Sequence, residues 1–223
     1  MRGWLKLTIG LGVLAGLLVG ADRVAVGVAE DEAADRLVSS GRLSTRPSVS
    51  IDGFPFLTQA VSGEFDGVRL SAADVQVSDG RQQVAVHGFT ARLSGVTVGG
   101  SYRSATVRSA TGSGKISYPD AAKLVQGADR LAFSYGGPGK VKASLAGISI
   151  GEGNVHSEGN TVVADGFQLT VLASALNGKV KDLLAPRSFT LTNLPAGLSL
   201  AGVTPEQDGL LLDFRGSDVR LIG

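Results

Sequence analysis

The sequence predicts an α+β fold dominated by antiparallel strands and preceded by a hydrophobic N-terminal helix. Many short segments alternate apolar and polar residues with the period of two that a half-buried strand requires. Glycine is frequent, with 32 of 223 residues, whereas aromatic residues make up only 5%. Few segments have the helical period, so strands outnumber helices, as expected for the α+β class.

Residues 1–21 are expected to be a signal peptide or a membrane anchor. Arg2 and Lys6 precede the apolar stretch Leu7 to Ala21. At about 1.5 Å per residue this stretch is roughly 22 Å long, shorter than a bilayer core of about 30 Å. Its length favours a signal peptide, but apolar residues resume after Asp22 and favour an uncleaved anchor, so both interpretations stay open. Either way, the charge pattern predicts that the rest of the chain is exported.

Residues 22–40 are expected to form a connecting helix that packs on the domain. Val26, Ala29, Ala33 and Leu37 fall on one stripe at helical spacing. The polar face of this helix is acidic, whereas a helix lying on a membrane surface usually carries basic residues there. Packing on the domain is therefore the favoured interpretation, and residues 41–223 are predicted to form one α+β domain.

The most specific part of the chain begins at Pro47. A strand around Val49 and Ile51 is ended by Asp52-Gly53, and the aromatic turn Gly53-Phe-Pro-Phe-Leu-Thr-Gln59 follows. A short helical segment then ends at Ser62-Gly63, and the next alternating strand begins at Phe65.

This pattern resembles the LmeA-like phospholipid-binding proteins of actinobacterial cell envelopes. The resemblance is specific in Gly53–Gln59 and extends loosely over most of residues 22–223, up to closing strands around Leu212 and Val219. It implies a curved sheet wrapped on a helix around an apolar tube, similar to tubular lipid-binding folds. It also implies phospholipid as the partner, and a supporting role in lipoglycan or envelope biogenesis.

Large apolar residues of the aromatic turn and of the alternating strands are the candidate ligand-binding residues. Pro55 is expected to direct the two neighbouring rings to different sides, one into the domain and the other to the apolar cavity, with Phe56 as the cavity candidate. The turn has a purely structural interpretation as well, because it can join helix to sheet without a ligand. The candidates are Phe54, Phe56, Leu57, Val86, Phe89, Phe167, Leu169 and Val171.

A short glycine-containing motif recurs along the chain. Ala91–Gly99 matches Ala143–Gly151 at an offset of 52 residues, and Leu200–Thr204 is a shorter echo. Glycine inside a strand usually marks a bulge or a bend, so three such strands predict a strongly curved sheet. Chance similarity between strands of similar composition stays open. Helices are expected from Tyr118 to about Gln126 and from Ser174 to Leu184.

Signals for catalysis and for metal binding are weak. Gly147-Ile-Ser149-Ile-Gly151 satisfies G-x-S-x-G, but a nucleophile elbow requires a strand-to-helix turn, and Ser149 lies in a predicted strand. Gly112-Ser-Gly-Lys115 lacks the Ser or Thr of a phosphate loop. His87 and His156 are the only histidines, and no carboxylate spacing typical of a metal site accompanies them. We therefore expect no catalytic residue, no metal and no cofactor.

The protein is expected to bind phospholipid without catalysis in the cell envelope. It would lie outside the cytoplasm, either attached to the cytoplasmic membrane through its N-terminal segment or secreted. A net charge of +1 gives no basic field for nucleic acid. The alternative is an envelope structural or protein-interaction module with a filled core, and a hydrolase using Ser149 is a third hypothesis.

Overall fold

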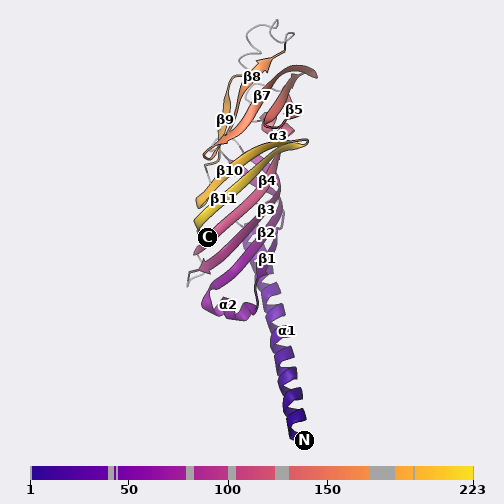
Figure 1. Ribbon diagram of the computed structural model, residues 1–223, viewed down its shortest axis with the longest axis vertical. Coiled ribbons are helices and arrows are strands. Elements are labelled where there is room, and N and C mark those ends of the chain that lie inside the picture. Colours follow the sequence, from indigo (N-terminus) through magenta and orange to yellow (C-terminus); the bar gives the residue numbers. More distant parts are fainter. Residues whose placement is uncertain are drawn as a thin grey trace.

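The computed structural model describes residues 2–39, 43, 45–78, 83–99, 104–123, 131–170, 184–192 and 194–222, with side chains in the first helix from residue 15 onward. The molecule is elongated, with a long N-terminal helix at one end and two antiparallel sheets following one another along the long axis (Figure 1). The helices are α1 (Arg2–Ser39), α2 (Phe56–Ser62) and α3 (Tyr118–Lys123).

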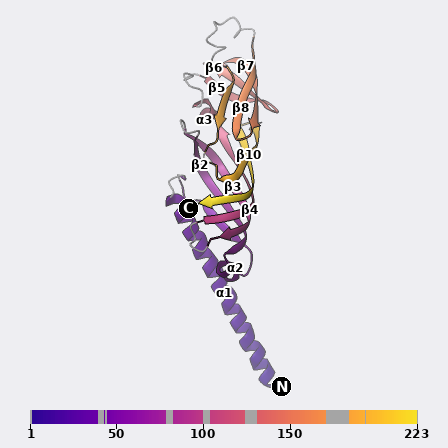
Figure 2. The ribbon, with the colours of Figure 1, turned by 90° about the vertical axis from the view of Figure 1, so that its left-hand side faces the viewer.

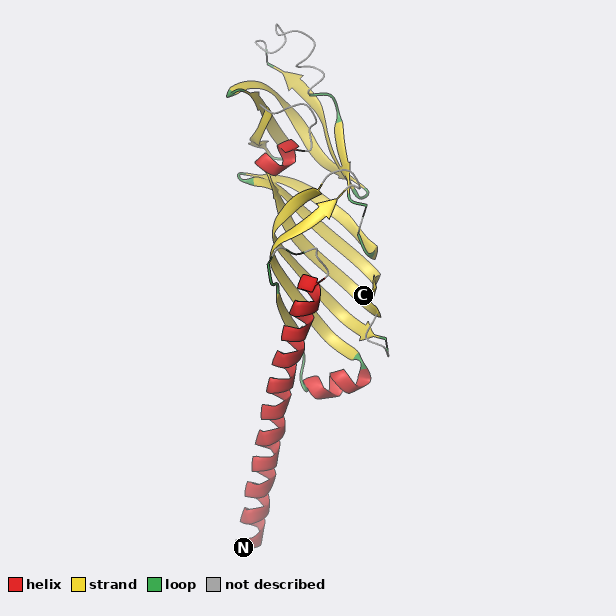
Figure 3. Ribbon diagram, turned by 180° about the vertical axis from the view of Figure 1, so that it is seen from behind, coloured by secondary structure: helices red, strands yellow, loops and turns green. Residues whose placement is uncertain are grey.

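Helix α1 is continuous through the expected targeting segment and the expected connecting helix. Its first half extends away from the sheets, and its second half lies beside the larger sheet (Figures 1 and 3). Val26 and Ala34 are buried there, and Glu30 accepts a hydrogen bond of 2.7 Å from the backbone N–H of Ile51. Helix α1 thereby covers the outer edge of the first strand, which would otherwise present unpaired backbone groups. Among the residues described here, no helix combines the length and the apolar character needed to cross a membrane.

The larger sheet has six antiparallel strands in the order β1-β2-β3-β4-β11-β10. Strands β1 and β10 are its two edges, so the sheet does not close into a barrel. The coarse prediction of antiparallel sheets with few helices is confirmed, whereas the apolar tube and the strong curvature stay predictions. The strands are β1 (Ser48–Asp52), β2 (Glu64–Ser78), β3 (Gln83–Val98), β4 (Ser104–Ser117), β10 (Ala196–Glu206) and β11 (Gly209–Ile222).

Two glycines allow β3 to keep its apolar side chains on one face over 16 residues. Gly88 and Gly95 have φ of 59° and 62°, in the region that glycine enters without steric cost. A register shift between β3 and β4 accompanies Gly88, as a bulge requires. Around Gly95, Leu93 and Val96 are three positions apart yet pack in the same buried cluster. The sequence-based expectation of glycine-marked irregularities is therefore correct for this strand.

The recurring motif does not form equivalent structures. Gly95 lies inside β3, but the corresponding Gly147 and its neighbour Ala146 have φ of 83° and 51° and form a two-residue turn between β6 and β7. Consecutive left-handed residues are typical of a type I′ hairpin turn. The third copy lies beside a register shift between Leu200 and Gly202. The prediction of three kinked strands is therefore wrong for the middle copy, because the same glycine can bend a strand or reverse the chain, depending on strand pairing.

The smaller sheet has five antiparallel strands in the order β5-β6-β7-β8-β9 and lies at the end remote from the N-terminus (Figures 1 and 2). The chain thus folds into two sheets, where one curved sheet was expected. The helix expected from Tyr118 is described as far as Lys123, and the helix expected over 174–184 lies outside the described residues, except for Leu184. The strands are β5 (Leu131–Gly137), β6 (Lys140–Leu145), β7 (Ile148–Glu158), β8 (Thr161–Leu169) and β9 (Arg187–Thr190).

Candidate functional site

The predicted apolar site residues lie in three separate parts of the molecule. The first part is the start of α2, at the lower end of the larger sheet (Figure 1): α2 begins with Phe56 and Leu57, and Phe54 precedes it by two residues. Val86 and Phe89 lie near the middle, in β3, where Val86 is buried and Phe89 is half-buried. The third group lies in the smaller sheet: Phe167 and Leu169 are half-buried in β8, and Val171 lies outside the described residues.

A continuous apolar interior connects these parts. Four buried clusters follow one another: a lower cluster around Val107, a central cluster around Leu212, a junction cluster around Tyr118 and an upper cluster around Ile150. The junction cluster combines residues from both sheets. Half-buried residues pack against two clusters each and join them: Leu198 for the lower and central clusters, Val203 for the central and junction clusters, and Phe133 and Phe167 for the junction and upper clusters.

The inner face of β2 and β3 is an apolar surface that the protein covers only in part. Side chains on the other face of β3, such as Thr90 and Arg92, are exposed, as expected for alternation. The apolar side chains of the inner face pack against the lower and central clusters but stay half-buried. We call five of them the inner strip: Phe65, Val68, Phe89, Leu93 and Val98. Phe89 also meets Phe214 of β11 edge to face, with ring centroids 6.5 Å apart.

The aromatic turn separates its two rings. Phe56 is 6% exposed and packs 6.1 Å from the Phe65 ring, measured between centroids, whereas Phe54 is 60% exposed. The guanidinium of Arg23, on α1, lies 5.2 Å from the centroid of the Phe54 ring, within cation–π range. The structure therefore assigns Phe56 to the packed side of the turn and Phe54 to the surface.

Asp22 fixes α2 against α1. Its side chain is buried, and one carboxylate oxygen accepts a 2.8 Å hydrogen bond from the backbone N–H of Leu57, in the first turn of α2. This bond satisfies one of the N–H groups that a helix start leaves unpaired. Burial alone raises the pKa of Asp22, but hydrogen bonds from Arg23 and from the Leu57 and Phe56 backbones outweigh it, so the pKa is lowered. Asp22 therefore stays ionised at this contact.

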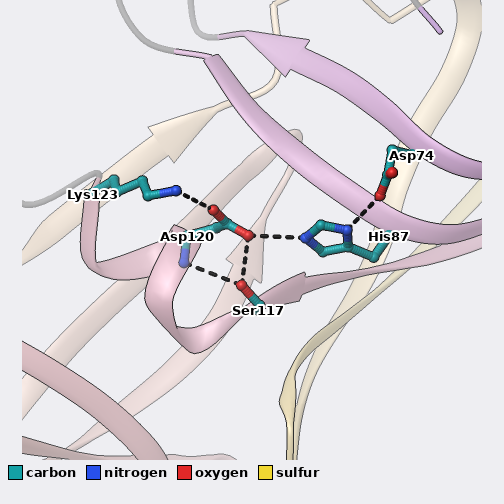
Figure 4. Close-up of polar contacts among 5 residues, drawn as sticks. All are labelled: Asp74, His87, Ser117, Asp120 and Lys123. Carbon is teal, nitrogen blue, oxygen red and sulfur yellow. Dashed lines mark hydrogen bonds and ion pairs between the residues drawn. The ribbon is translucent and has the colours of Figure 1, made fainter. Parts of the chain in front are cut away.

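A polar cluster that the sequence did not predict lies at the junction of the sheets (Figure 4). His87 of β3 lies between two carboxylates, with Nδ1 2.5 Å from Asp74 of β2 and Nε2 2.9 Å from Asp120 of α3. Lys123 and Ser117 also contact Asp120, at 2.7 and 2.5 Å. Both ring nitrogens face carboxylate oxygens, so only the imidazolium can donate to both.

The charged groups of this cluster stabilise one another in their ionised forms. The pKa of His87 is raised, first by its hydrogen bond to Asp120 and then by that to Asp74, and burial opposes this only in part. Burial alone raises the pKa of Asp120, but hydrogen bonds from Lys123, Ser117 and His87 outweigh it and hold the pKa far below its ordinary range. The cluster therefore joins β2, β3 and α3 by charge-assisted hydrogen bonds. The one local signal in the sequence was Ser117 before α3, whose Oγ accepts from the N–H of Asp120 as an N-cap does.

The geometry of this cluster does not resemble a hydrolase triad. A nucleophilic serine needs a base on its hydroxyl, but Ser117 Oγ donates to Asp120, and both nitrogens of His87 are occupied by carboxylates. Ser149 lies in strand β7, as the sequence predicted. It is exposed there and pairs with Ser144 of β6. Gly112-Ser-Gly-Lys115 lies within β4 rather than in a loop. Within the described part of the chain, no three His, Cys, Asp or Glu side chains gather into a possible metal site.

Comparison with known proteins places the chain in a family. The model of the LmeA-like phospholipid-binding family matches residues 20–215, most of the chain, and the protein belongs to this family. The match begins two residues before Asp22, whose carboxylate binds the start of α2, and ends within β11, so it covers the smaller sheet, most of the larger sheet and the packed part of α1. No curated protein and no solved structure gives a significant match.

Proposed function

We propose that this member of the LmeA-like phospholipid-binding family holds the acyl chains of a phospholipid against the inner strip. The observation that carries the proposal is the incomplete cover of the inner strip, Phe65, Val68, Phe89, Leu93 and Val98, on the inward face of two long strands. A sheet face that belongs to a finished core is normally buried. Acyl chains would complete this burial.

The energetics of acyl-chain binding suit such a surface. Each methylene removed from water contributes about 0.8 kcal/mol, so ten methylenes contribute roughly 8 kcal/mol before the cost of ordering the chain. This binding needs no specific polar partner, and a site of this kind can be built from ordinary core residues. Half-buried apolar residues that join the clusters, such as Leu198, Val203 and Phe133, offer acyl chains further apolar contacts beyond the inner strip.

The finer parts of the function are proposals of the same kind. We infer that the protein works outside the cytoplasm, attached to the cytoplasmic membrane by its N-terminal segment or released by cleavage, and that it supports lipoglycan or envelope biogenesis without catalysis. The charge pattern around residues 2–35 supports export. Sequencing the N-terminus of the mature protein distinguishes the two forms, because a start at Asp22 means cleavage.

Lipid analysis of the purified full chain tests lipid binding. The chain is purified from bacterial membranes, and its phospholipid is measured by native mass spectrometry and by extraction. Leu93→Gln places an amide on the inner strip and should lower the amount of phospholipid per folded molecule. The matched control is Ser94→Gln, which introduces the same side chain at the next position, on the exposed face of β3, and should leave the amount unchanged.

Two outcomes would count against the proposal. A wild-type chain that carries no phospholipid, and takes none up from vesicles, would favour the alternative of an envelope structural or protein-interaction module with a filled core. Equal lipid content in both glutamine variants would move the site away from the inner strip.

A further inference from the structure

Helix α2 and the segment just before it expose large apolar side chains to solvent. Phe54, Leu57 and Val61 are 60%, 41% and 91% exposed, and we call these three residues the foot patch. Leu57 and Val61 are four residues apart and therefore lie on one face of the helix. Phe56, on the other face, is buried. Helix α2 thus exposes Leu57 and Val61 beside the polar Thr58 and Ser62, whereas the outer face of a surface helix is normally polar.

The foot patch adjoins the apolar N-terminal stretch. Helix α2 lies across the lower end of the larger sheet, beside the point where α1 leaves the domain (Figure 3). The hydrogen bond from the Leu57 N–H to Asp22 fixes this contact at 2.8 Å. Leu18 lies one turn before Asp22, on the same face of α1, and is 60% exposed. Exposed apolar side chains therefore continue from α2 onto α1, toward the stretch Leu7 to Ala21.

The chemistry around the foot patch fits the interfacial layer of a bilayer. Arg23 has an exposed side chain (49%) and stacks on Phe54, and such a residue can keep its charge among headgroups while its stem lies on apolar surface. The exposed residues that follow α2 include the acidic Glu64 and Asp66, which would not attract anionic lipid. Apolar insertion, and not electrostatic attraction, would therefore drive docking.

We propose that the foot patch inserts into the surface of a phospholipid bilayer, with α2 lying in the interfacial layer. The domain would then stand on the membrane in a fixed orientation, with the lower end of the inner strip, at Phe65, next to the lipid. The docking rests on the exposure of the foot patch and its continuity with α1, and it does not depend on whether the inner strip carries lipid.

Site-specific fluorescence in the full chain tests the docking. Because the chain has no cysteine, Val61→Cys and Ile148→Cys each provide one labelling site. Ile148 is the matched control, since it is also an exposed apolar residue (53%) but is the first residue of β7, in the smaller sheet. With phosphatidylcholine vesicles, an environment-sensitive dye at position 61 should shift to the blue and lose most of its quenching by iodide. The dye at position 148 should change in neither respect.

Two further measurements separate the foot patch from the N-terminal stretch and from electrostatic binding. Phe54→Glu in the Val61→Cys chain should abolish the blue shift and restore quenching of the dye by iodide, even though the N-terminal stretch still holds the chain on the vesicle. Raising the salt from about 0.1 to 1 M, which shortens the Debye length from about 10 to 3 Å, should leave the signal unchanged.

The proposal is overturned if the two dyes remain equally accessible to iodide on vesicles, or if Phe54→Glu leaves the position-61 signal unaltered. Protection of position 61 that grows with protein concentration in the absence of vesicles would also overturn it, because a second copy of the chain would then cover the foot patch.

Discussion

The unequal burial of the two rings in the aromatic turn gives the sharpest stability prediction. Phe56→Ala removes a ring that is 6% exposed and packs against Phe65. Truncation of a buried Phe typically costs about 3–5 kcal/mol in the free energy of unfolding. A domain of 150–250 residues loses about 2–4 °C of melting temperature per kcal/mol. We therefore expect a drop of roughly 6–20 °C for this variant.

Phe54→Ala is the matched comparison, because it removes the same ring two positions earlier. Phe54 is 60% exposed, and its ring makes a cation–π interaction with Arg23. Such an exposed pair contributes about 0.5–1 kcal/mol, so the melting temperature should fall by less than about 4 °C. Thermal unfolding of both full-length variants, followed by far-UV circular dichroism, measures the difference. Equal shifts, or a larger shift for Phe54→Ala, would refute the assignment of Phe56 to the packed side.

Three further predictions concern other parts of the fold. His87→Gln should be less stable than the wild type below about pH 6.5, and this difference should disappear as the pH rises through the folded-state pKa of His87, because a raised histidine pKa stabilises the fold only while the imidazolium is present. The difference in the free energy of unfolding should stay under about 1 kcal/mol, since the His87 side chain is 44% exposed. Urea unfolding at a series of pH values measures it, and a loss of stability that does not depend on pH would contradict the assignment. Gly95→Ala should cost about 1–2 kcal/mol in urea unfolding, because φ is 62° and the new Cβ would lie 3.1 Å from Arg108 Cβ, and a neutral result would mean that β3 relaxes at this point. Ser149→Ala should leave the melting temperature within about 2 °C and bound lipid unchanged, because Ser149 is exposed on β7, and stoichiometric reaction of Ser149 with a serine-hydrolase probe would revive the enzyme hypothesis.

Local patterns in the sequence were sufficient for several elements. The motif Ala91–Gly99 predicted a strand, and all of it except Gly99 lies in β3, where side chains alternate with the period of two. Ser62-Gly63 predicted the end of the short helix, and Gly63 has a φ of 72° at its C-cap. The block Gly53–Gln59 identified the family, which the match over residues 20–215 confirms. All of these depend on residues that are close in sequence.

Features that depend on the pairing of distant strands could be seen only in the tertiary structure. Asp74 and Asp120 meet His87 across 13 and 33 residues of sequence, and only the register of β2 with β3 and the position of α3 bring them together. The same dependence explains why Gly147 reverses the chain where Gly95 continues it, and why the strands divide into two sheets. The outward position of Phe54 and the inward position of Phe56 follow from the contact of Asp22 with α2 and of Phe56 with Phe65. The sequence by itself thus determined several strands and the short helix, because backbone geometry imposes their periods, and it identified the family through the block Gly53–Gln59. Only the packing of distant segments decided which apolar residues are covered and which face the surroundings.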